Sequence, residues 1–170
     1  MPTLKPRGLR WLKSCHLVCV SCWVGGAVSL ILLYFLKSGV TDGGVLYGIN
    51  QSIHYVDKVV VVIPGAFGCL ITGLLYSLLS NWGFFKHGWL VFKWAVTMSA
   101  ILFGTFFLGP WETTMMEISA RLGISSLSNQ AYLYNQRMNV LFGSLQVLIL
   151  IVTVFISVFK PWKSSKAKKQ

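Results

Sequence analysis

Ionisable side chains are scarce in this sequence, and three of them border or interrupt long apolar stretches. His16 and His87 stand near the starts of two such stretches, and Lys93 lies six residues beyond His87. Neutral imidazole is a common axial ligand of haem iron. A cation without an acid at its own depth can pair with a haem propionate, a quinone or a lipid phosphate. The pattern predicts a haem b site with His16 as one ligand, and with His87 or Lys93 as the second ligand or as a propionate partner.

Each of these side chains also has a structural explanation. The long stem of Lys93 can carry its ammonium group back to the lipid headgroups, and an imidazole at a wet interface costs little. His54 lies on the opposite side of the predicted membrane, so it cannot share an iron with His16.

Cys15, Cys19 and Cys22 recur at helical spacing on one face of the first apolar stretch. Thiolates bind Cu(I), so this face is an alternative metal site for copper. The same stripe continues through Gly26 and Ser29, and small residues at this spacing let two membrane helices approach closely. The face therefore indicates helix packing, with copper binding as the alternative.

These residues must be positioned by membrane helices. Of the 170 residues, 55% are apolar and only 11% are charged, against about 25% charged residues in a typical soluble domain. Four apolar stretches have about the length that crosses a bilayer, and they run over 14–36, 58–79, 88–109 and 138–159. The fold class predicted is an all-α, four-span transmembrane helix bundle, formed by a single domain over 1–162 and followed by a basic tail over 163–170.

The charge distribution predicts the orientation of the bundle. The net charge is +11, and it falls on the N-terminal flank, the 80–94 region and the C-terminal tail, whereas the two other connections sum to zero. Positive residues favour the cytoplasmic side of a membrane, so both termini are expected in the cytoplasm. The expected location is the plasma membrane, with several spans. Anionic lipid headgroups suit these basic ends, and no nucleic-acid partner is expected.

The connections are predicted to differ. Residues 80–87 form a short turn, which makes the second and third spans antiparallel neighbours. The glycine-rich 37–57 connection is expected to be a flexible loop, and 110–137 to be a helix, a break at Gly123 and a second helix capped by Ser128 or Asn129. Pro64 should kink the second span, and no Asp or Glu is expected inside any span.

Several short motifs carry a family resemblance. The stretches Trp11–Leu17 with Trp23–Gly26, Val56–Asp57 with Ile63–Gly65, Trp89 to Trp94, and Phe159–Trp162 resemble the DUF2269 family of small integral membrane proteins. That family is similar to a wider set that includes the CopD membrane domain and the HemJ-type protoporphyrinogen oxidases. The set shares a first-span His and a third-span Lys, matched here by His16 and Lys93. The resemblance implies haem; the Arg that follows the first-span glycines in HemJ-type proteins has no counterpart over Leu30–Tyr34.

The sequence contains no nucleophile–base pair, phosphate-binding loop or paired carboxylates, so hydrolase and phosphotransfer chemistry have no support. We expect a small b-type haem protein in electron transfer or redox chemistry. Its expected partners are a membrane redox protein or a quinone, and the chain is also a candidate for homo-oligomer formation. The alternative is a non-enzymatic protein of copper handling, or an assembly or accessory protein of a membrane complex.

Overall fold

The structure, a computed structural model, describes residues 4–80 and 83–162. The predicted basic tail and part of the predicted 80–87 turn lie outside the described residues. In chain order the elements are α1 (Pro6–Leu36), α2 (Gly43–Val56), η1 (Asp57–Phe67), α3 (Gly68–Leu79), α4 (Gly88–Phe103), η2 (Gly104–Leu108), α5 (Gly109–Leu122), η3 (Gly123–Ser128) and α6 (Gln130–Phe159).

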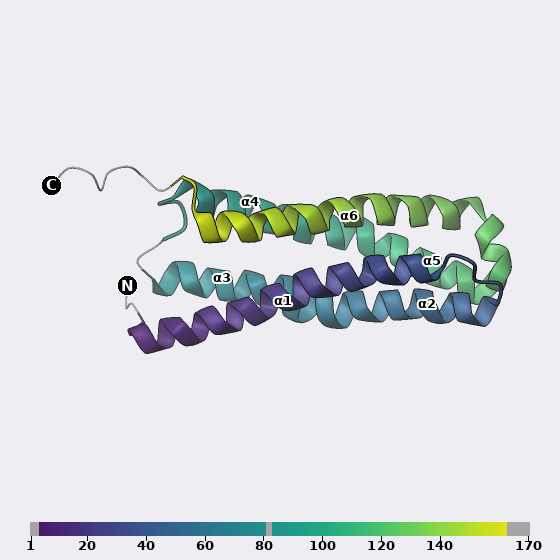
Figure 1. Cartoon of the computed structure of the whole chain (residues 1–170), viewed down its shortest axis with the longest axis horizontal. Coiled ribbons are helices and arrows are strands. Elements are labelled where there is room, and N and C mark those ends of the chain that lie inside the picture. Colours follow the sequence, from purple (N-terminus) through teal and green to yellow (C-terminus); the bar gives the residue numbers. More distant parts are fainter. Residues whose placement is uncertain (1–3, 81–82, 163–170) are drawn as a thin grey trace.

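These elements join into a bundle of four long apolar helices (Figure 1). They span Pro6–Leu36, Gly43–Leu79, Gly88–Ser128 and Gln130–Phe159, with 31, 37, 41 and 30 residues. About 20 residues cross the hydrocarbon core, so every one of the four is long enough to cross a membrane and to extend beyond it. The all-α prediction is confirmed, with four helices that could each form a span.

The outer surface of the bundle is apolar. Large side chains such as Phe35, Phe106, Val158 and Phe159 are between 66% and 74% exposed. A surface of this kind is unfavourable in water, where extended apolar patches drive association, and it suits contact with lipid chains. Helix length and surface together support a multi-pass integral membrane protein.

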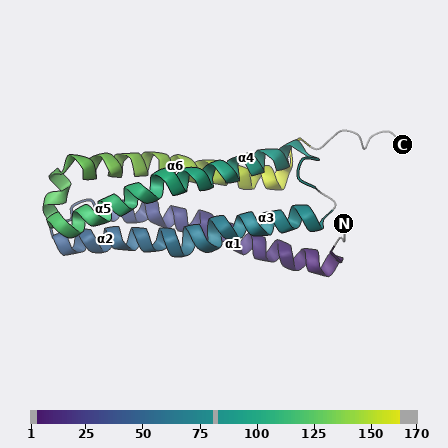
Figure 2. The same cartoon turned by 180° about the vertical axis from the view of Figure 1, so that it is seen from behind.

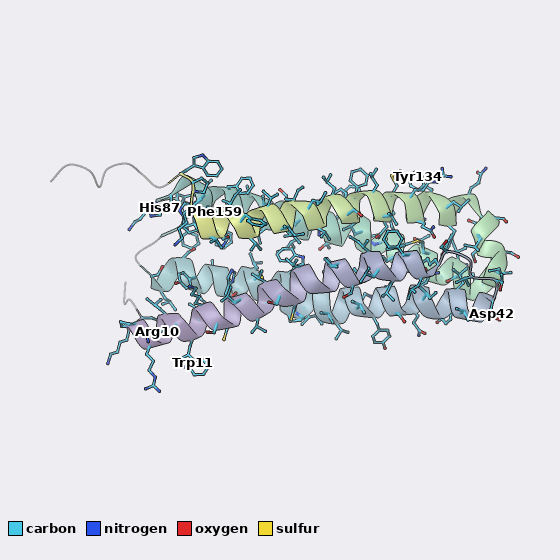
Figure 3. All side chains as sticks on the ribbon, in the orientation of Figure 1. Arg10, Trp11, Asp42, His87, Tyr134 and Phe159 are labelled. Atoms are coloured by element: carbon cyan, nitrogen blue, oxygen red, sulfur yellow. The ribbon has the colours of Figure 1, made fainter. Side chains whose placement is uncertain are left out.

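The helices alternate in direction, so α1 begins and α6 ends at the same end of the bundle (Figures 1 and 2). We call this the terminal end. There the backbone N–H of Leu4 donates to the carbonyl of Leu79 at 3.1 Å. Figure 3 places Arg10, Trp11, His87 and Phe159 at this end and Asp42 at the opposite, distal end.

The prediction of a flexible loop over 37–57 is wrong for most of that range, because Gly43–Val56 forms helix α2. The Asp42 carboxylate accepts a hydrogen bond from the Val45 N–H at 2.8 Å and so caps the first turn. Leu46, Asn50 and Ile53 are buried at helical spacing on one face. Tertiary packing of this face outweighs the low helix propensity of the glycines.

The break predicted within 110–137 is confirmed. Helix α5 ends at Leu122, and the next residue, Gly123, has a φ of 54° and begins a short 3₁₀ segment. The Asn129 side chain then accepts from the Tyr132 N–H at 3.1 Å, and caps α6.

Two segments adopt the wider π-helical geometry. Pro64 lies inside η1, and η2 ends two residues before Pro110. Proline removes one backbone donor and crowds the preceding turn, and π geometry keeps both long helices continuous through these positions. Such segments occur frequently at functional sites.

Helix α1 approaches η1 closely at two glycines. A Cβ built on Gly65 would lie 2.8 Å from the Trp23 Cα, and one built on Gly26 would lie 2.8 Å from the Val61 Cγ2. Only glycine permits this distance at either position. We call these four residues the glycine seam.

Candidate functional site

A cavity at the terminal end of the bundle has a volume of about 490 Å³. It is lined by residues of α1, α3, α4 and α6, including His16, Trp23, Trp89, Lys93 and Lys160. Its size falls within the range of small-molecule and cofactor sites, roughly 300–1,000 Å³. We call it the basic cavity.

His16 is held against α3 by a hydrogen bond to Thr72. The Thr72 hydroxyl donates to the carbonyl of Gly68 at 2.5 Å, and its oxygen lies 2.7 Å from the Nδ1 of His16. With the Thr72 proton engaged with Gly68, this geometry favours the tautomer in which Nδ1 of His16 donates to Thr72. In that tautomer Nε2 retains its lone pair, as in a metal-ligating histidine whose other nitrogen is hydrogen-bonded.

The charge in the basic cavity is entirely positive. Lys13, Lys93 and Lys160 line it, and among the described residues no Asp or Glu does. Lys93 is close enough to act electrostatically on His16. Its Nζ lies 6.0 Å from the centre of the Trp89 ring, and the Nζ of Lys160 lies 5.7 Å from the same ring. The cavity thus combines an apolar aromatic wall with a charge that favours an anionic group.

The structure brings together His16 and Lys93 of the predicted site but not His87. His87 is the residue before α4, and its ring stacks on Trp89 at 6.2 Å between centroids. His87 is not among the residues that line the basic cavity. His54 lies in α2, in the part of that long helix that leads to the distal end.

The cysteine face is used at least partly for packing. Cys19 packs against α3, because a Cβ built on Gly68 would lie 2.7 Å from the Sγ of Cys19. Cys15 is exposed, and Cys22 is partly buried. Within residues 4–80 and 83–162, no three His, Cys, Asp or Glu side chains are grouped so that they could hold a metal ion.

Sequence reasoning missed a second polar cluster. Asp57 and Glu112 lie just outside the predicted spans 58–79 and 88–109, but within the long helices Gly43–Leu79 and Gly88–Ser128. The cluster was missed because the helices continue beyond the apolar stretches, through positions assigned to loops. A detectable signal was the spacing of Leu46, Asn50 and Ile53 after a capping Asp42, which is helical.

Lys37 follows α1 and belongs to the same cluster. It is only 5% exposed, and its Nζ lies 4.2 Å from the centre of the Tyr34 ring. Burial lowers the pKa of Lys37 to about 7, and the negative charge of Glu112 opposes this decrease. An ordinary lysine has a pKa of about 10.4, so Lys37 is neutral or charged according to conditions near neutrality.

No family model, no curated protein and no solved structure matches this chain. The resemblance to the DUF2269 family therefore stays a prediction.

Proposed function

We propose that the basic cavity binds a b-type haem, with His16 as an axial ligand of the iron. The observation that carries this proposal is the His16–Thr72 hydrogen bond, which favours an unprotonated Nε2 on His16 in a cavity of suitable size and charge. A bound haem would supply reversible one-electron transfer.

The other lining residues have roles that follow from their chemistry. Lys93 offers a cation to a propionate, or its amine to the iron as a second ligand. Trp23 and Trp89, each 4% exposed, give the cavity broad apolar walls against which a flat ring can pack. Lys13 and Lys160 add positive charge, which favours an anionic occupant over a cationic one.

The terminal end of the bundle is proposed to face the cytoplasm. The support is the excess of Lys and Arg on the segments that meet there, together with the common end of α1 and α6. Reporter fusions at positions 45, 84 and 125 should give cytoplasmic signal only at 84. An external signal at 84 would reverse the orientation.

A plasma-membrane location, contact with anionic lipids and exchange of electrons with a quinone or a membrane redox partner belong to the same proposal. Their support is the basic terminal end and the redox chemistry that haem would bring.

The test is the visible absorption spectrum of the protein purified from haem-replete cells. Wild type should show a Soret band and a reduced α-band, and His16→Ala should lose both. His54→Ala is the matched control, because His54 does not line the basic cavity, and it should keep both bands. A colourless wild-type protein would remove the proposal and favour an assembly or accessory role.

A further inference from the structure

The second cavity lies between the glycine seam and the distal end and has a volume of about 190 Å³. Apolar side chains of α1 and α6 form much of its wall. Its polar lining is made of Tyr34, Asp57, Glu112, Asn139, Ser144 and Gln146. A water molecule needs only about 10–15 Å³ of such volume, so the cavity has room for a small ion with several waters. We call it the acidic cavity.

Glu112 is the central polar group of this cavity. It is 3% exposed, and its Oε1 accepts a hydrogen bond from the Nδ2 of Asn139 at 3.3 Å. Within the described part of the chain, its Oε2 is buried and has no hydrogen-bond partner. A buried carboxylate oxygen left bare is costly. The side chain therefore requires either a proton on this carboxyl group or a bound cation.

A second hydrogen bond fixes the position of Asn139. Its Nδ2 also donates to the carbonyl of Leu108 at 3.0 Å. Leu108 is the last residue of the π-helical segment η2, and Asp57 is the first residue of the π-helical segment η1. Wider helical segments of this kind occur frequently at functional sites, and here two of them lie beside the carboxyl groups of Glu112 and Asp57.

With Lys37 in its charged form, the charged groups around Glu112 leave one negative charge uncompensated inside the bundle. Asp57 faces it from η1 and interacts with it electrostatically. Lys37 is the buried cation nearby, and its Nζ lies against the rings of Tyr34 from α1 and Tyr132 from α6, outside the cavity lining. Lys58, the neighbour of Asp57, is exposed.

We propose that the acidic cavity binds one monovalent cation, Na⁺ or a proton, between the carboxyl groups of Glu112 and Asp57. The amide oxygens of Asn139 and Gln146 and the hydroxyls of Ser144 and Tyr34 are neutral oxygen groups in its lining. With Lys37 in its charged form, two carboxylates and one ammonium group leave a net charge of −1. One monovalent cation neutralises this charge, whereas a divalent ion would leave an excess of positive charge. Oxygen ligands of this type are those preferred by hard cations. This site is separate from the proposed haem site and does not depend on it.

The first arm of the test is thermal unfolding of the detergent-purified protein, followed by tryptophan fluorescence, as Na⁺ replaces choline at constant ionic strength and pH. A ligand that binds only the folded state raises the melting temperature in a saturable way. If Na⁺ is the occupant, wild type shows a saturable increase of a few degrees, and Glu112→Gln shows none. Glu117→Gln is the matched control on the same helix, because Glu117 is exposed, and it should respond as wild type does.

The second arm detects the proton. Infrared difference spectra across a pH titration should then show the C=O band of a protonated carboxyl group that disappears as the pH rises, and this band should be missing in Glu112→Gln or weakened in Asp57→Asn. The proposal is overturned if wild type shows neither a saturable Na⁺ response nor a titrating carboxyl band. It is also overturned if Glu112→Gln and Asp57→Asn, when folded, both retain the wild-type response.

Discussion

The basic cavity at the terminal end and the acidic cavity towards the distal end share no lining residue, although α1 and α6 line both of them. The first is about 490 Å³ and lined by three lysines, and the second is about 190 Å³ and lined by two carboxylates. The glycine seam separates them along α1. This opposite charge is the basis of the two proposals, in which the terminal end binds an anionic ligand and the acidic cavity binds a cation.

The largest change in stability is expected from Lys37→Met, which removes the buried cation beside the acidic cavity. Folding disfavours the charged form of Lys37, whose pKa is lowered to about 7. Between about pH 7 and pH 10 the unfolded chain binds more protons than the folded protein at this residue, so the wild-type free energy of unfolding rises with pH in this window.

Lys37→Met should therefore stabilise the protein most at about pH 6, by about 4–5 kcal/mol, and this gain should shrink towards about pH 10. Melting temperatures at both pH values measure it, and Lys5→Met serves as control, because Lys5 is exposed and precedes α1 at the terminal end. A variant that is less stable than wild type at both pH values would show instead that the Lys37 ammonium group stabilises the fold through Glu112.

A smaller effect is expected from Gly65→Ala, which tests whether the glycine seam holds the two cavities in place. The new methyl group would lie 2.8 Å from the Trp23 Cα, so α1 and η1 must separate. Overpacking of this kind costs about 1–3 kcal/mol. Because Trp23 lines the basic cavity and Val61 the acidic one, ligand responses of both cavities should weaken together.

Gly25→Ala is the matched control, because a Cβ at Gly25 meets no atom within 4 Å. Thermal unfolding should show a lower melting temperature for Gly65→Ala and almost no change for Gly25→Ala. Equal melting temperatures for the two variants would show that the seam tolerates a wider separation.

The smallest effect is expected when Cys15, Cys19 and Cys22 are changed together to Ala. This variant asks whether thiolates contribute to ligand binding at the terminal end. Alanine keeps the helix surface small, so haem content should be unchanged and the free energy of unfolding should fall by less than about 1 kcal/mol. Metal analysis completes the test: copper that is bound by wild type and lost from the triple variant would support the copper alternative.

The sequence predicted correctly those features that depend on the length of an apolar stretch or on a single polar residue within it. Long apolar runs predicted the helices of the bundle, and an isolated Lys93 at the depth of His16 predicted two side chains that the structure places in one cavity. The break at Gly123 and the cap at Asn129 followed from local turn and capping chemistry.

The acidic cavity escaped prediction for a physical reason. Its acids lie just beyond the apolar runs, where charge and glycine content are typical of loops, and only tertiary packing makes these segments helical. The contacts of Glu112 with Asn139, 27 residues further along the chain, depend on how α5 packs on α6. The role of Thr72 in setting the His16 tautomer likewise depends on a contact across 56 residues, which no local pattern reveals.

The central claim is that the basic cavity selects an anionic ring ligand through Lys93. The most direct test titrates protein purified from haem-deficient cells with haem and with haem dimethyl ester, which lacks both carboxylates. A charge-assisted contact contributes about 1.5–3 kcal/mol, so wild type should bind haem at least about tenfold more tightly than the ester. Lys93→Met should lose this preference. Equal affinity of wild type for the two compounds, or an undiminished preference in Lys93→Met, would contradict the claim.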